Sequence, residues 1–187
     1  ISLLILASIV IKSDGKVDNR ELNFVRNQFV GIYGKERANK AFQLFKGVMK
    51  KQVSARQVCI QIRQHMPHSS RLQLLHFLFG IAQADEHVSE IEVDEIRKIA
   101  GYLYINQYDF ESIKAMFYKS TDSAYKILEI STSATDSELK KAYRKMVKKY
   151  HPDKLTGLGN EHLEGAKEKF QNIQAAYETI KKERGLS

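Results

Sequence analysis

The run His151-Pro152-Asp153-Lys154 places an imidazole and a carboxylate on either side of a proline, a combination of residues that could do chemistry. A histidine can act as a general base or a metal ligand, and a carboxylate can form a charge-assisted bond to an arginine. Catalysis would need a nucleophile or second carboxylate and a pocket, and metal binding would need further ligands at helical spacing. Neither is evident beside His151. We therefore expect this run to carry out no bond chemistry.

A basic amphipathic helix leads directly into the run. Thr135 and Glu138 predict a capping box at its start, in which each side chain bonds a backbone amide that the helix leaves unpaired. Apolar residues at intervals of three and four predict one buried stripe, formed by Leu139, Ala142, Tyr143, Met146, Val147 and Tyr150. The opposite face is entirely basic, with Lys140, Lys141, Arg144, Lys145, Lys148 and Lys149. The like charges on this face repel one another, and binding to a partner would relieve that repulsion. The alternative is that the face is an ordinary solvated helix surface.

The proline ends this helix, because it disfavours the helical conformation at the residue before it. A loop containing Gly157 and Gly159 follows, and a second long helix is expected over about residues 164–182. Its inward positions are Leu163, Ala166, Phe170, Ile173, Tyr177 and Ile180. Together with a short helix over residues 124–130, these patterns predict an antiparallel helical hairpin.

The first 119 residues contain an internal repeat. In each copy an apolar helix runs into a tight turn and then into a second helix with its own capping box, Asp18 with Glu21 or Ser89 with Glu92. Further apolar faces bring the expected total to about seven helices, packed as two related hairpins with additions. A polar stretch from Lys119 to Ser123 then predicts the boundary between two domains, residues 1–119 and 120–187.

The repeat also supplies five acidic residues that could offer oxygen ligands to a divalent cation: Asp14, Asp18, Glu21, Asp85 and Glu92. Their spacing is not that of a calcium-binding EF-hand loop. Helix capping accounts for Asp18 and both glutamates, and the other two can serve turns. We therefore predict no metal and no cofactor, and a cation site at these carboxylates is the alternative.

Composition excludes several classes of protein. Two prolines, ten glycines and many helix-forming residues predict an all-α fold. A single cysteine, Cys59, excludes intramolecular disulfides and zinc sites built on paired cysteines, which favours a reducing compartment. The net charge of +8 is spread over both predicted domains. No aromatic residues interleave with the basic helix face, so specific nucleic-acid binding is not expected.

The C-terminal segment resembles the J domain of the DnaJ family. The resemblance rests on Tyr125-Lys126-Ile127-Leu128, the basic helix, the His151-Pro152-Asp153-Lys154 run and Phe170-Gln171-Asn172-Ile173-Gln174-Ala175-Ala176-Tyr177. It implies a co-chaperone, not an enzyme, that stimulates ATP hydrolysis by a DnaK-type chaperone. The basic face would dock on an acidic surface of the ATPase, and His151, Pro152 and Asp153 would act where its nucleotide domain meets the linker.

The first 119 residues resemble a TerB-like helical domain, through the turns Asp14-Gly15-Lys16-Val17-Asp18 and Asp85-Glu86-His87-Val88-Ser89. Because Glu86 stands where the first turn has Gly15, the two turns need not share a backbone conformation. A TerB-like domain followed by a J domain is similar to bacterial membrane-anchored DnaJ-like proteins. That similarity implies a cytoplasmic location, an inner-membrane anchor before residue 1 and a client or partner of unknown identity on residues 1–119. The apolar run from Leu3 to Ile11 is too short to be that anchor.

Overall fold

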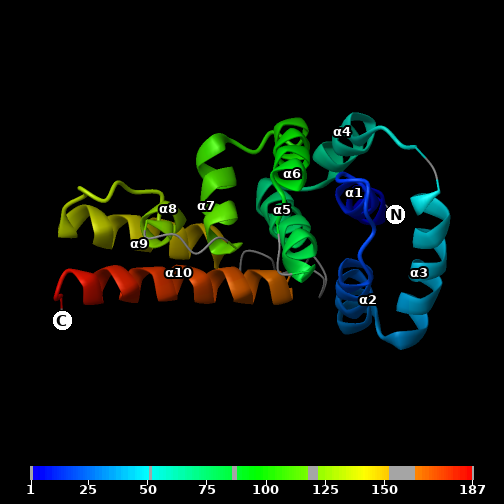
Figure 1. Cartoon of the computed structure of the whole chain (residues 1–187). Coiled ribbons are helices and arrows are strands. Elements are labelled where there is room, and N and C mark those ends of the chain that lie inside the picture. Colours follow the sequence, from blue (N-terminus) through cyan, green and yellow to red (C-terminus); the bar gives the residue numbers. More distant parts are fainter. Residues whose placement is uncertain (1, 51, 86–87, 118–121, 152–162, 187) are drawn as a thin grey trace. The chain divides into compact units, whose positions relative to one another are not determined.

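The computed structural model contains helices and no strand among the residues that it describes, which confirms the predicted all-α fold (Figure 1). By its internal contacts the chain separates into two compact units, Ile1–Ile105 and Asn106–Ser187. The residues described are 2–50, 52–85, 88–117, 122–151 and 163–186.

The first unit contains six α-helices and one short 3-10 helix over its described residues. They are α1 (Ser2–Ile11), α2 (Asn19–Tyr33), α3 (Lys35–Met49), α4 (Ala55–His65), α5 (His68–Ala82), η1 (Gln83–Asp85) and α6 (Glu90–Tyr102). With α7 (Gln107–Phe117), they account for the seven helices predicted before residue 119. None of the helices in the described part of the chain is long and apolar enough to cross a membrane.

Two helices that are buried on nearly every side, α1 and α5, form the centre of the first unit. Helix α1 packs against α3, α4 and α5, while α5 also contacts α2 and α6. A helix without a polar face is stable in water when other elements cover it on all sides. The fully buried side chains include Leu6, Phe45, Cys59, Leu75, Phe79, Ile96 and Leu103.

Both copies of the internal repeat have the predicted capping box. The amide of Asp18 donates to Glu21 Oε2 at 3.1 Å, and the Asp18 side chain accepts bonds from the start of α2. In the second copy the Ser89 amide donates to Glu92 Oε2 at 2.8 Å, and the Glu92 amide donates to Ser89 Oγ at 3.2 Å. Each pair satisfies backbone donors that would otherwise lack partners at a helix start.

The turns that precede these caps differ between the two copies. Gly15 lies in the left-handed region with φ of 80°, where glycine has no steric penalty. In the second copy the chain forms the 3-10 helix η1, and Glu86 falls outside the described residues.

The second unit contains α7, α8 (Ser123–Ile127), α9 (Asp136–Tyr150) and α10 (Leu163–Glu183) among its described residues. Helices α9 and α10 pack together, and α10 also packs on α8. The rings of Tyr143 and Tyr177 stack with centroids 4.2 Å apart, joining α9 to α10 on the predicted inward faces. The predicted short helix ends at Ile127, earlier than the expected residue 130, because Glu129 has a left-handed φ of 58°.

Helix α7 belongs to the second unit by its contacts. It packs on α8, and Ser112 Oγ donates to the carbonyl of Ile127 at 2.8 Å. The domain boundary predicted between residues 119 and 120 lies within residues 118–121, outside those that the structure describes, and stays a prediction.

Candidate functional site

The basic face of α9 is exposed at five of its six basic residues. Leu139, Met146 and Tyr150 are buried, as the apolar stripe predicted. Thr135 and Glu138 form the predicted capping box, with the Thr135 amide donating to Glu138 Oε2 at 2.7 Å. The exposed basic residues are Lys140, Lys141, Arg144, Lys145 and Lys148. Lys149 is partly buried, with a side chain 24% exposed.

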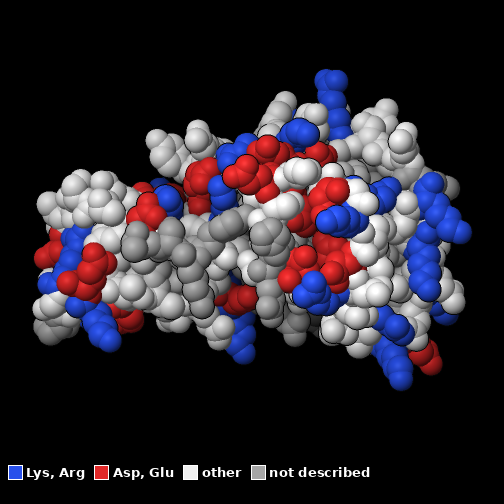
Figure 2. All heavy atoms as spheres, viewed as in Figure 1, with Lys and Arg blue, Asp and Glu red and all other residues white. Residues whose placement is uncertain are grey.

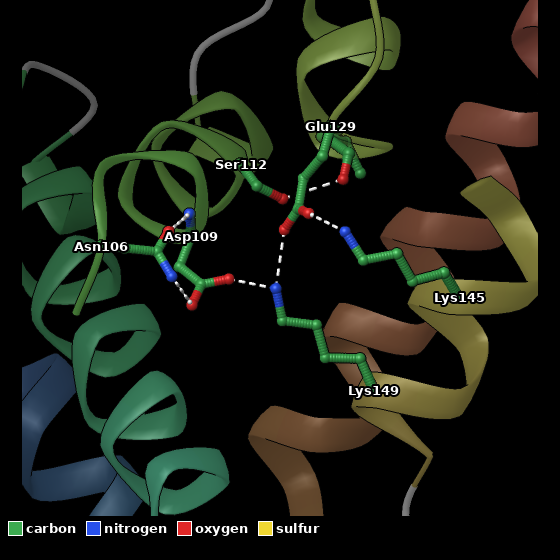
Figure 3. A network of polar contacts seen from close by, with 7 residues as sticks. Asn106, Asp109, Ser112, Glu129, Lys145 and Lys149 are labelled. Atoms are coloured by element: carbon green, nitrogen blue, oxygen red, sulfur yellow. Dashed lines mark hydrogen bonds and ion pairs between the residues drawn. The ribbon is translucent and has the colours of Figure 1, made fainter.

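Two of the six basic residues take part in a network of polar contacts within the second unit (Figure 3). Lys145 Nζ donates to Glu129 Oε2 at 3.0 Å, and Lys149 Nζ donates to Glu129 Oε1 at 2.7 Å. Lys149 also donates to Asp109 in α7. Asn106 holds Asp109, since its side-chain amide donates to Asp109 Oδ2 at 3.0 Å and its carbonyl accepts the Asp109 amide at 2.9 Å.

Both carboxylates in this network are withdrawn from water. The side chain of Glu129 is 7% exposed and that of Asp109 is 1% exposed. Burial alone would lower the pKa of Lys149, but its hydrogen bonds and charge interactions with Asp109 and Glu129 outweigh this effect and raise the pKa. Lys149 is therefore protonated throughout the physiological pH range. An open polar pocket of about 260 Å³ lies over the network.

His151 follows α9 directly and has the extended backbone expected before a proline, with φ of −63° and ψ of 130°. Its ring meets Phe170 of α10 edge to face, with centroids 5.9 Å apart. The end of the basic helix is thus held against the partner helix of the hairpin. Pro152, Asp153 and Lys154 lie outside the described residues, as do Gly157 and Gly159.

A buried lysine lies behind the basic face. Lys169 of α10 is 0% exposed, and its Nζ lies 5.3 Å from the ring centroid of Tyr150. Neither the ammonium of Lys169 nor the hydroxyl of Tyr150 has a hydrogen-bond partner among the described residues. Burial lowers the pKa of Lys169 well below its usual value, because an ammonium loses its hydration there.

Arg184, just beyond α10, links separate segments of the second unit through its side chain. Its guanidinium donates to the carbonyls of Ala134 at 2.6 Å and Thr132 at 3.2 Å, and to Asp136 Oδ1 at 3.0 Å. It also donates to the hydroxyl of Tyr125 at 3.3 Å. One side chain thus joins the end of α10 to α8 and to the segment that opens α9.

The carboxylates weighed as cation ligands do approach one another in the first unit. Glu92, Asp85 and Asp14 all act on Glu21 through their charges, and Figure 2 shows acidic side chains gathered where α1 and α2 meet α5 and α6. Within the described part of the chain no three acidic, histidine or cysteine residues are arranged to hold a metal ion. The capping bonds of Glu21 and Glu92 account for their positions.

The pKa of the Glu21 carboxyl group is raised. Its side chain is buried, with 5% exposure, and this burial is the main cause that raises the pKa. The bond from the Asp18 amide lowers the pKa, whereas repulsion from nearby carboxylates raises it further. The resulting pKa is about 7. The pKa in the unfolded chain is near 4.5. Between these values the folded chain holds a proton that the unfolded chain has released, so the free energy of unfolding falls as pH rises from 4.5 to 7.

Glu21→Gln should therefore gain stability over the parent as pH rises. The amide keeps an oxygen for the capping bond and has no charge at any pH. We expect equal stability near pH 4.5 and an advantage on the order of 2 kcal/mol at pH 8. Urea unfolding at several pH values measures this difference. A difference that stays constant across the range would mean that Glu21 titrates like an ordinary glutamate.

Sequence patterns did not single out Asp109, Glu129, Lys169 or Arg184. Lys149, which bonds Asp109, and the partners of Arg184 lie 40 or more positions away, so no local spacing indicates these pairs. The sequence did contain an indication for Lys169, because this charged residue lies beside the apolar face of its helix. Glu129 offered another, as a charged residue directly after the buried Leu128.

Two family models together match most of the chain. The model described as tellurite resistance protein TerB matches residues 1–115, and the DnaJ domain matches residues 123–185. The two matches agree with the sequence resemblance in kind and in order. No solved structure matches the chain significantly.

Curated relatives are named co-chaperone protein DjlA. The chain is 51% identical to the protein of Shewanella oneidensis over 69 residues, which are 36% of this chain and 26% of that protein. Identity is 52% over 65 residues with the Vibrio cholerae protein and 46% over 67 residues with that of Coxiella burnetii. These matches cover 34% and 35% of this chain, and 23% and 25% of the relatives.

The matched region thus spans about a quarter of the length of these relatives. The TerB match alone covers more than half of this chain, and the DnaJ match takes in α8, α9, His151 and α10. The chain therefore belongs to the TerB family and carries a DnaJ domain after its TerB region.

Proposed function

We propose that this chain is a co-chaperone that docks on a DnaK-type chaperone and stimulates its ATP hydrolysis. The observation that carries the proposal is the exposed basic face of α9, which leads directly into His151 at the start of the His-Pro-Asp run. Several lysines on one face favour fast, salt-sensitive encounter with an acidic surface. The DnaJ match and the DjlA names of the relatives support the same partner.

The chain itself need not be an enzyme in this scheme. Docking would bring Asp153 to an arginine of the chaperone, where a charge-assisted bond couples binding to hydrolysis. The chemistry would be carried out by the ATPase. Residues 1–119 would bind a client or regulatory partner, because the chain has no cysteine-rich zinc region to hold clients. The resemblance to bacterial membrane-anchored DnaJ-like proteins further suggests that the protein would act in the bacterial cytoplasm from a membrane anchor.

Single-turnover ATP hydrolysis by a DnaK-type chaperone, measured at rising concentrations of the chain, tests this function. The parent should accelerate hydrolysis in a saturable way. Arg144→Ala combined with Lys148→Ala should raise the half-maximal concentration roughly tenfold and weaken its salt dependence, because both side chains are exposed and act through attraction at a distance. Excess protein should restore the full rate.

The matched control removes two exposed lysines from α3, by Lys40→Ala and Lys46→Ala. It changes net charge by the same amount and leaves α9 intact. Unchanged stimulation by this control would assign the effect to the basic face. If the parent chain does not accelerate hydrolysis at any concentration, the proposed function is wrong.

A further inference from the structure

The basic face of α9 is divided into two parts by its internal partners. Lys145 and Lys149 lie four residues apart, on one edge of the helix, and both donate to Glu129. The other basic residues form no ion pair with any residue that the structure describes: Lys140, Lys141, Arg144 and Lys148. A partner that approaches α9 therefore meets four available charges and two that are already engaged.

Glu129 is held in an unfavourable backbone conformation. Its φ of 58° places a non-glycine residue in the left-handed region, which costs conformational energy. Its carboxylate is nevertheless buried and bonded to two lysines. Backbone bonds at the end of α8, from the Glu129 amide to the Lys126 carbonyl and from the Ile130 amide to the Tyr125 carbonyl, help to offset that strain, and the two lysines are the side-chain partners of the carboxylate.

Asp109 brings a second buried carboxylate to the same edge, from a different part of the sequence. It lies in α7, within the region matched by TerB, whereas Lys149 lies within the DnaJ match. Helix α7 begins at Gln107, directly after the first unit ends at Ile105. Because Asp109 is part of α7, a displacement of this helix would break the contact between Asp109 and Lys149.

We propose that Asp109 and Glu129 form an internal acidic clamp, which occupies Lys145 and Lys149 and competes with the acidic surface of the chaperone. This inference rests on the proposed function and concerns its regulation. The clamped chain docks through the four available basic residues. Opening the clamp adds Lys145 and Lys149 to the docking face and tightens binding. Because Asp109 comes from α7, anything that moves this helix adjusts the affinity of the J domain.

The competing explanation is that these ion pairs only fix α9 in place. The two explanations predict opposite effects when the clamp is neutralised. A structural brace would give equal or weaker docking after its loss, whereas an inhibitory clamp gives tighter docking.

The test uses the full chain and measures its binding to the ATP-bound chaperone and the half-maximal concentration for ATPase stimulation. Glu129→Gly removes one carboxylate and suits the left-handed backbone, so the fold should persist. Asp109→Asn removes the other charge while keeping the size of the side chain. The control is Glu178→Gln, which alters an exposed carboxylate of α10 and gives the same change in net charge.

We expect Glu129→Gly and Asp109→Asn each to lower the half-maximal concentration threefold to tenfold, and Glu178→Gln to leave it near the parent value. Adding Lys145→Ala and Lys149→Ala should abolish the gain. If Asp109→Asn does not fold, Glu129→Gly alone decides. Half-maximal concentrations equal to that of Glu178→Gln, or higher, in folded variants would overturn the clamp. Failure of the parent to stimulate at all would instead overturn the proposed function and the clamp with it.

Discussion

Asp153→Asn should abolish stimulation of the chaperone at every concentration of the chain. Asparagine keeps the size and turn preference of aspartate but has no charge, so an arginine of the chaperone would lose a charge-assisted bond. Docking through α9 should continue, because the basic face is unchanged. We expect at least a tenfold loss of the maximal rate in single-turnover hydrolysis.

Comparison with the α9 variant separates docking from triggering. Excess protein should restore the rate for Arg144→Ala with Lys148→Ala, whereas no excess should restore it for Asp153→Asn. Circular dichroism would verify that both variants remain helical. If folded Asp153→Asn stimulates as well as the parent, the charge-assisted bond is not the trigger and a binding module without activating power becomes the better description.

Phe79→Ala should destabilise the first unit by about 3–5 kcal/mol. Phe79 lies in α5 at the centre of that unit and is 0% exposed, so truncation leaves a cavity that neighbouring helices cannot readily fill. The second unit should keep its stability, because its buried residues come from α7 to α10. Hydrogen exchange followed by mass spectrometry measures the two units separately.

Leu44→Ala is the control for this substitution. Leu44 lies in α3 and is 58% exposed, so its truncation should cost about 0.5 kcal/mol or less. If Phe79→Ala accelerates exchange in α9 and α10 as much as in α5, the two units unfold as one cooperative block. Protection lost from the first unit alone would agree with two separately stable units.

Local patterns predicted the elements of this protein well because their physical causes are local. A capping box places its two partners three residues apart, so Thr135 and Glu138 could be recognised from spacing alone. The stripe that buries Met146 follows from helical periodicity in the same way. Helical periodicity also placed Tyr143 and Tyr177 on the inward faces of the hairpin, although it did not predict that the two rings stack on each other.

The internal partners of the basic face could not be predicted from such patterns. From the sequence alone, the lysines and the arginine on this helix face appear as six equivalent charges. Whether Lys149 is free or buried depends on where α7 packs, and α7 has no sequence feature that pairs it with α9. The early end of α8 had no sequence signal either, because a glutamate and not a glycine takes the left-handed position at which the Glu129 and Ile130 amides bond the carbonyls of Lys126 and Tyr125.

The position of Arg184 has a consequence for how the protein is made. Its guanidinium joins residues that precede it by 48 to 59 positions, whereas the core of the first unit is complete once Ile105 has been synthesised. On the ribosome the first unit can therefore fold while α9 still lacks its partner helix. The hairpin closes after residue 184 has emerged. We expect a nascent chain to acquire its TerB region first, and its ability to recruit a chaperone last.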